Sequence, residues 1–154
     1  MSLISSLTKE DLINVENESL NYESFFEDAS KTLLKKGYVK ESFYKAILER
    51  EKKYPTGLEL PKITIAIPHT DTEHVNEPFI FINKMKEKNI EFTQMGTDDV
   101  FVKPEFIIIL GIKEPKEQVG LLSSMMSLFD NESFVNEIRN SNSVDDMYKI
   151  FKEQ

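Results

Sequence analysis

The chain has 154 residues, of which 40% are hydrophobic and 30% charged, and its formal net charge is −8. This length predicts a single domain over residues 1–154, and the excess of acidic over basic side chains argues against nucleic acid as a partner. Because the sequence contains no cysteine, disulfides, thiolate metal sites and cysteine nucleophiles are excluded.

Two helices are predicted in the first third of the chain. Ser24 followed by Glu27 has the pattern of a capping box, and the helix that starts there should end at Gly37. A second helix is predicted over residues 41–53, where apolar side chains recur at helical spacing until Pro55 stops it.

The middle of the chain changes to strand patterns. Apolar residues alternate with smaller or polar ones over residues 63–67, and residues 78–82 and 90–93 are two further strand candidates. Residues 106–112 are continuously apolar and mostly β-branched, which predicts a central strand buried on both faces.

Helical spacing returns at Pro115, which suits the first turn of a helix. Its apolar stripe is predicted to comprise Val119, Leu122, Met126 and Phe129, with Leu121, Met125 and Leu128 beside it. Two more short helices are predicted over residues 132–138 and 144–151. Helices on both sequence sides of the strands predict an α/β sandwich, with a small mixed sheet flanked by helices.

The sequence predicts a cytoplasmic location. Its opening, MSLISSLTKEDL, lacks the basic stretch and long apolar run of a secretory signal. The longest apolar stretch, residues 106–110, is far shorter than the ~20 residues that cross a bilayer.

His69 directly follows a predicted strand and Pro68, whose ring restricts the backbone and biases Ile67 to stay extended. In α/β sheets, ligand sites gather beyond the carboxyl ends of strands. Neutral imidazole keeps a lone pair near pH 7, because its unperturbed pKa is ~6.5, and it can form a covalent phosphohistidine. His69 is therefore a candidate nucleophile. The alternative is a histidine whose hydrogen bonds simply stabilise the end of the strand.

Arg50 continues the apolar stripe of the second predicted helix, so its side chain should point toward the edge of the core. A guanidinium there needs an anionic partner, and a phosphoryl group suits its planar fork. The alternative is an ordinary ion pair with Glu51 or another nearby carboxylate.

Three motifs stand in a fixed order: ILERE at residues 47–51, PTG at 55–57 and IAIPH at 65–69. With them, the sequence resembles the enzyme IIA components of bacterial sugar phosphotransferase systems, in the fructose–mannitol class. The similarity covers most of the chain and implies one IIA domain of this type. It implies that His69 is the phosphorylated residue, that Arg50 stabilises the phosphoryl group, and that Thr56 could contact it, although Thr56 could equally stabilise the turn.

One position departs from the fructose–mannitol pattern. Many of those proteins have a second histidine before the LL of the later helix, whereas this chain reads PKEQVGLL and has Gln118 there. A second histidine soon after AIPH, the PTG loop and a glutamine before LL resemble the galactitol-type members instead. Gln118 can donate a hydrogen bond to phosphate oxygens but cannot titrate.

The resemblance implies phospho-HPr as the phosphoryl donor and a cysteine of a IIB protein as the acceptor. The membrane component IIC would be engaged only indirectly, and no sugar would bind this chain. No Walker A loop or dinucleotide fingerprint occurs, so no nucleotide cofactor is expected. The alternative function is a regulatory module of the nitrogen-related enzyme IIA type, which acts by binding other proteins.

Residues 69–74 are a candidate metal site, because His69, Asp71, Glu73 and His74 occur together there. Their spacing matches no zinc signature, so no metal is expected and His74 is interpreted as a surface or hydrogen-bonding residue.

Overall fold

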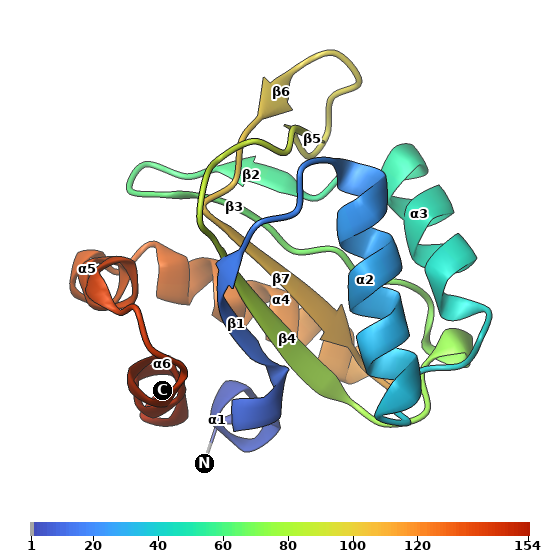
Figure 1. The fold of residues 1–154 in the computed structure, drawn as a ribbon, viewed down its shortest axis with the longest axis horizontal. Helices are drawn as coiled ribbons and strands as arrows, with labels where there is room; N and C mark the ends of the chain where they lie inside the picture. Colours follow the sequence, from blue (N-terminus) through green and yellow to red (C-terminus); the bar gives the residue numbers. More distant parts are fainter. Residues whose placement is uncertain (1) are drawn as a thin grey trace.

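The computed structural model describes residues 2–154 and shows a five-stranded mixed sheet with helices on both faces (Figure 1). The strands of this sheet, in spatial order, are β1 (Ile13–Asn17), β4 (Phe79–Met85), β7 (Phe106–Gly111), β3 (Thr64–Ala66) and β2 (Gly57–Glu59). β1 runs parallel to β4 and β3 parallel to β7, whereas the β4–β7 and β2–β3 pairs are antiparallel. The α/β class and the mixed sheet are as predicted.

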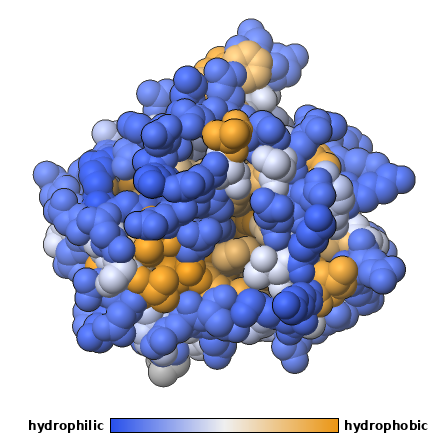
Figure 2. Space-filling model, viewed as in Figure 1, coloured by the Kyte–Doolittle hydropathy of each residue, from blue (hydrophilic) through white to orange (hydrophobic). Residues whose placement is uncertain are grey.

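A separate two-stranded hairpin projects beyond one end of the sheet (Figure 1). It consists of β5 (Phe92–Thr93) and β6 (Phe101–Val102), which pair in the antiparallel direction. Figure 2 shows a mostly hydrophilic surface with a hydrophobic patch at this end of the molecule, where Met95, Val100 and Phe101 are exposed.

The helices form the two outer layers. They are α1 (Leu3–Leu7), α2 (Tyr22–Lys35), α3 (Phe43–Lys53), α4 (Pro115–Phe129), α5 (Glu132–Asn140) and α6 (Val144–Lys152), with short 3₁₀ turns at Glu10–Leu12 and Thr72–His74. Side chains from α2 and α3 pack on one face of the sheet, and those from α1, α4, α5 and α6 pack on the other. No helix within residues 2–154 is long and apolar enough to cross a membrane.

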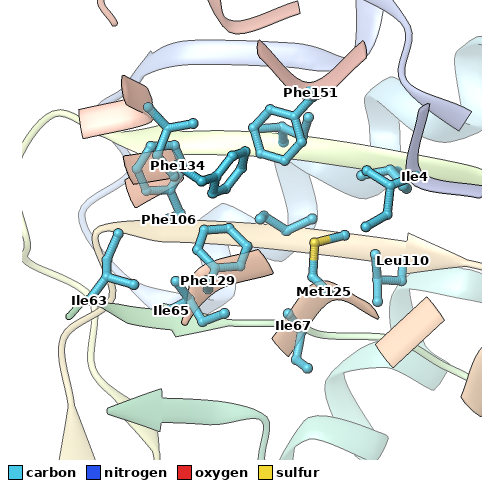
Figure 3. Packing of buried hydrophobic residues seen from close by; sticks show 14 of the residues in the cluster. Ile4, Ile63, Ile65, Ile67, Phe106, Leu110, Met125, Phe129, Phe134 and Phe151 are labelled. Carbon is cyan, nitrogen blue, oxygen red and sulfur yellow. The ribbon is translucent and has the colours of Figure 1, made fainter. Parts of the chain in front are cut away.

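The central strand β7 is buried along its whole length, as its apolar run predicted. Its side chains alternate between the two cores: Phe106, Ile108 and Leu110 face one, and Ile107 and Ile109 face the other. Burying both faces removes apolar surface from water on both sides, which is the main favourable contribution to folding. Figure 3 shows the first core, where phenylalanines from α4, α5 and α6 lie against the sheet.

Two details of the predicted helices were wrong. Asn21, not Ser24, caps α2, because its side-chain oxygen accepts the Ser24 backbone N–H at 2.8 Å. Glu27 instead pairs with Lys31 one turn later on the helix surface. Gly37 does end this helix with a positive φ of 84°, a conformation that glycine adopts without steric cost.

The stripe predicted for α4 was wrong in part, because Phe129 is buried but Val119 and Met126 are not. The buried side chains are Leu121, Met125 and Phe129, whereas Val119 is 71% exposed and Met126 also faces solvent. Apolar residues occur nearly all around this helix, so two neighbouring stripes fit the same spacing. The packing against the sheet buries Leu121 and Met125 from the second of these stripes together with Phe129 from the first.

Candidate functional site

The backbone around His69 is held against the central strand. After β3 ends, the carbonyl of Pro68 accepts the Leu110 N–H at 2.9 Å, and His69 lies in a parallel bridge with Leu110. β3 and β7 are parallel, so His69 lies just beyond the carboxyl end of β3 and beside the last residues of β7. His69 as a whole is 9% exposed, so a buried residue stands on a stiff support at the edge where α/β proteins place their sites.

One hydrogen bond fixes which ring nitrogen of His69 carries a proton. Nδ1 lies 2.8 Å from the carbonyl oxygen of Ile67, and a carbonyl oxygen can only accept. Nδ1 is therefore the protonated nitrogen of the neutral ring, and Nε2 keeps its lone pair. The arrangement makes Nε2 the nucleophilic atom.

The surroundings of His69 favour its neutral form. Burial is the main cause that lowers the pKa of His69, and the positive charge of Arg50 lowers it further. The hydrogen bond to Ile67 and the charge of Asp71 act in the opposite direction but do not reverse the effect. A neutral imidazole at pH 7 is the form that can attack an electrophile.

The side chain of Arg50 extends from α3 toward the segment that follows His69. Its Nη1 donates to Oδ1 of Asp71 at 3.1 Å, and its guanidinium carbon lies 5.1 Å from the centre of the Tyr54 ring. The ion pair foreseen as the alternative for Arg50 therefore exists, with Asp71 as the partner. Asp71 stands two residues after His69, so this pair also brings a cation close to the ring.

Glu51, the neighbour of Arg50, faces inward and fixes the PTG loop. Its two carboxylate oxygens accept the backbone N–H and the hydroxyl hydrogen of Thr56, each at 2.7 Å. The single hydroxyl hydrogen of Thr56 is thus donated to Glu51, and the residue is only 3% exposed. This geometry favours the turn-stabilising alternative for Thr56, while contact with a phosphoryl group stays a prediction.

The glycine of the same motif has a packing reason. A side chain at Gly57 would place a Cβ atom 2.6 Å from the carbonyl oxygen of Thr93 and 2.8 Å from a methyl group of Val102. Only glycine allows the β5–β6 hairpin to approach β2 this closely. Thr56 and Gly57 therefore connect α3, the main sheet and the hairpin.

Gln118 lies in the first turn of α4, which begins four residues after the end of β7. Gln118 and His69 are therefore at the same edge of the sheet, on separate segments, and the Gln118 side chain is partly exposed. Across residues 2–154, no hydrogen bond joins the two side chains, and the position of Gln118 is consistent with the predicted role without testing it.

His74 forms hydrogen bonds, which agrees with its interpretation as a hydrogen-bonding residue. Its Nδ1 lies 2.8 Å from the Ser42 hydroxyl, and its backbone carbonyl accepts the Lys40 N–H at 3.0 Å. The adjacent Val75 carbonyl accepts a hydrogen bond from Lys113 at 2.8 Å. Within the part of the chain that the structure describes, no group of three His, Asp or Glu side chains is placed to hold a metal ion.

Sequence reasoning singled out His69 and Arg50 but missed two carboxylates. Asp71 was considered only as a metal ligand, and Glu51 only as a surface partner of Arg50. A signal for Glu51 existed: it is an acidic residue in the last turn of a helix, followed after five positions by a threonine in a tight loop. No local pattern indicates the Arg50–Asp71 pair, because 21 residues separate its members.

A buried neutral histidine beside an arginine, on a mixed sheet between two helical layers, defines a candidate group-transfer site. Residues 6–154 match the family described as "Phosphoenolpyruvate-dependent sugar phosphotransferase system, EIIA 2", and the chain belongs to this family. The members are phosphocarrier components of sugar phosphotransferase systems. The resemblance seen in the sequence is confirmed.

Two curated proteins are similar in sequence to this chain, and the match covers different shares of their lengths. The galactitol-specific EIIA component of Escherichia coli (strain K12) is 29% identical over 103 residues, which cover 67% of this chain and 67% of the relative. The mannitol-specific EIICBA component of Buchnera aphidicola (subsp. Baizongia pistaciae) is 28% identical over 152 residues, 96% of this chain but only 22% of that protein. The homology to a galactitol-specific component agrees with the subgroup that the motifs indicated.

Solved structures show the same fold. The mannitol IIA of Escherichia coli, determined in a complex with phosphorylated mannitol IIB, has a TM-score of 0.73 at 22% identity and covers 94% of this chain and 96% of its own. The nitrogen regulatory protein IIA-Ntr of Neisseria meningitidis has a TM-score of 0.74 at 22% identity, and the match covers 97% of this chain and 99% of that protein. At these identities the likeness concerns the fold.

Proposed function

We propose that this chain accepts a phosphoryl group from phospho-HPr on Nε2 of His69 and passes it to a cysteine of a IIB protein, in the uptake of a galactitol-like sugar. The observation that carries the proposal is the hydrogen bond from Nδ1 of His69 to the Ile67 carbonyl. It leaves Nε2 unprotonated on a ring whose pKa is lowered by burial. The family supplies the reaction class, and this geometry supplies the nucleophile.

The transfer conserves atoms and charge without a cofactor. The Nε2 lone pair attacks phosphorus, the bond between phosphorus and the donor atom breaks, and the donor leaves with that electron pair. In the second step a cysteine thiolate of IIB attacks the same phosphorus, and Nε2 recovers its lone pair. The protein contributes mainly positioning and charge neutralisation, as in other phosphoryl transfers.

Arg50 is the residue proposed to neutralise the transferred group. Its fork now donates to Asp71, which is well exposed, so a dianionic phosphoryl group on His69 can compete for the same donors. Gln118 and the backbone N–H groups at the start of α4 are proposed as further hydrogen-bond donors. In this scheme no sugar contacts the chain, and the membrane component meets it only through IIB.

The regulatory alternative requires the same phosphorylated histidine. At 22% identity, the likeness to the nitrogen regulatory protein concerns the fold and does not favour a regulatory role. The homology to galactitol-specific components is what supports the transport assignment.

The test is to incubate the protein with enzyme I, HPr and labelled phosphoenolpyruvate, and then with a galactitol-type IIB. The wild type and His74→Ala should take up acid-labile phosphate and pass it on, whereas His69→Ala should remain unlabelled. Circular dichroism shows whether each variant is folded. Labelling of a folded His69→Ala protein would refute the assignment.

A further inference from the structure

A chain of four hydrogen bonds connects a buried carboxylate to the imidazole of His69. Glu51 accepts the N–H and the hydroxyl of Thr56, both at 2.7 Å. The Thr56 carbonyl accepts the N–H of Ile67 at 3.4 Å, and the Ile67 carbonyl accepts Nδ1–H of His69 at 2.8 Å. The chain ends on the ring nitrogen opposite the one that has the free lone pair.

The position of the carboxylate needs an explanation, because burying a charge is costly unless it is fully hydrogen-bonded. Glu51 is 4% exposed, although it lies on a helix whose other acidic residue, Glu49, faces solvent. Its two oxygens satisfy both donors of Thr56, which would otherwise be buried without partners. Capping the turn explains the pair by itself, and the Thr56 carbonyl next to it accepts the N–H of the Ile67 peptide, whose own carbonyl orients His69.

The two bonds that lead from Thr56 through Ile67 to His69 depend on the two bonds by which Glu51 anchors Thr56. Thr56 and Ile67 continue the antiparallel β2–β3 ladder, in which Gly57 is opposite Ala66. The bond between them, at 3.4 Å the longest of the four, is the link through which the placement of Thr56 reaches the Ile67 peptide. On the other side, β7 holds Pro68 through Leu110. The Ile67 carbonyl is therefore fixed from one side by β7 and from the other by the loop that Glu51 anchors.

We infer that Glu51 is a positioning residue, which holds the ring of His69 in the Nδ1–H tautomer through Thr56 and Ile67. The inference rests on the proposed phosphoryl transfer for its catalytic consequence. Without the anchor, the Ile67 carbonyl loses its fixed position and the ring can populate the Nε2–H tautomer, whose Nε2 has no lone pair to attack with. In metal sites, replacing the direct partner of a ligating histidine's second nitrogen typically costs ~10–100-fold. Glu51 acts on the same nitrogen through Thr56 and Ile67, so the lower end of this range is expected.

The groups that face Glu51 are few. Arg50 precedes it on α3. Tyr22 from α2 is also close: burial is the main cause that raises the pKa of its hydroxyl, and the charge of Glu51 raises it further. Tyr22, Lys52 and Glu91 line a cavity of about 220 Å³ beside the carboxylate. Burial raises the pKa of Glu51 to about 7, against the two Thr56 bonds and the charge of Arg50. A charged and a neutral carboxyl therefore coexist near neutral pH, so each variant is measured over a range of pH.

The experiment uses three variants of the whole chain. Glu51→Leu removes both acceptors. Glu51→Gln keeps an acceptor for the Thr56 N–H and offers its amide hydrogen to the hydroxyl, so it preserves the anchor without the charge. Glu137→Leu makes the same substitution at an exposed position of α5, on the opposite side of the sheet, as the control.

Two quantities are measured on each protein. Ring ¹⁵N chemical shifts report the tautomer of His69, with the His74 signals identified from a His74→Ala sample. Transfer from phospho-HPr gives kcat and KM. We expect Glu51→Leu to show a mixture of tautomers and a kcat lowered on the order of tenfold, with KM changed by less than about twofold. Glu51→Gln should restore the Nδ1–H tautomer and most of kcat, and Glu137→Leu should match the wild type.

A folded Glu51→Leu protein with the wild-type tautomer and kcat would overturn the inference and leave Glu51 as a turn cap. If Glu51→Leu fails to fold, the nearly isosteric Thr56→Val decides: it removes the hydroxyl bond only, and an unchanged tautomer and kcat in it would overturn the inference. The tautomer measurement needs no phosphoryl donor. A wild type that takes up no phosphate would therefore refute the proposed function, while the ring shifts would still test the role of Glu51.

Discussion

Replacing Glu51 with glutamine should remove a loss of stability that the wild type undergoes as the pH rises toward neutrality. In the folded protein, burial raises the pKa of this carboxyl from an ordinary value of 4.5 to about 7. Between these two values the folded state binds more protons than the unfolded state, so the free energy of unfolding falls as the pH rises. The contribution is fully present below about pH 4.5 and is lost above about pH 7.

The size of the effect follows from the same two values. One pKa unit corresponds to ~1.4 kcal/mol, so the difference between 4.5 and about 7 corresponds to about 3 kcal/mol. Glutamine has nearly the same shape and preserves the contacts with Thr56, but it has no proton to lose. The unfolding free energy of Glu51→Gln, minus that of the wild type, should therefore rise by about 3 kcal/mol from low to neutral pH.

Urea denaturation of the wild type, Glu51→Gln and the exposed control Glu137→Gln, from about pH 4.5 to about pH 8, measures this difference. Other titrating groups, His69 among them, are common to all three proteins, and their contributions cancel in the subtraction. The Glu137→Gln difference should stay nearly constant. A constant Glu51→Gln difference over the same range would show that the carboxyl titrates normally, and would refute the argument from burial.

Three further predictions concern the site. Arg50→Lys keeps a positive charge but loses the planar fork, so single-turnover transfer through His69 should slow on the order of tenfold or more, which raises the barrier by ~1.4 kcal/mol or more. An unchanged rate would make Arg50 a structural ion-pair residue. Gln118→Ala should slow transfer modestly, because one neutral hydrogen bond contributes ~0.5–1.5 kcal/mol, and Gln118→His should add a pH-dependent step between about pH 5 and 8. If rate profiles over that pH range coincide for the wild type and both variants, Gln118 points away from the site. Gly57→Ala would place a methyl group 2.6 Å from the Thr93 carbonyl oxygen, so urea denaturation should show a free energy of unfolding lower by ~1–3 kcal/mol. A variant as stable as the wild type would contradict the packing argument.

The apolar patterns predicted the interior of this protein better than its edges. The run at residues 106–112 became the fully buried β7, because continuous β-branched and apolar residues suit a strand covered on both faces. The strand β1 was missed, since only Ile13 is buried and its other side chains are polar or partly exposed. Its place beside β4 depends on a parallel pairing with a strand far along the chain, which no local signal indicates.

The site was predictable to the extent that its residues stand in motifs. His69 and Arg50 followed from their places after a strand and on an inward helical phase. The partners that orient them, Asp71 and Glu51, depend on how α3, the PTG loop and the segment after β3 come together in space. Such contacts between segments are set by tertiary packing, so a single sequence shows the reactive groups more readily than the groups that hold them.

The central claim is that Nε2 of His69 is the atom that receives the phosphoryl group. The most direct measurement is NMR of the protein phosphorylated by enzyme I and HPr, with ³¹P and ring ¹⁵N signals assigned in ¹⁵N-labelled wild type and His74→Ala. One phosphohistidine signal, from His69 and with phosphorus bound to Nε2, is the predicted result, because the Ile67 carbonyl holds the proton on Nδ1. Phosphorus bound to Nδ1 of His69, or to His74, would contradict the account.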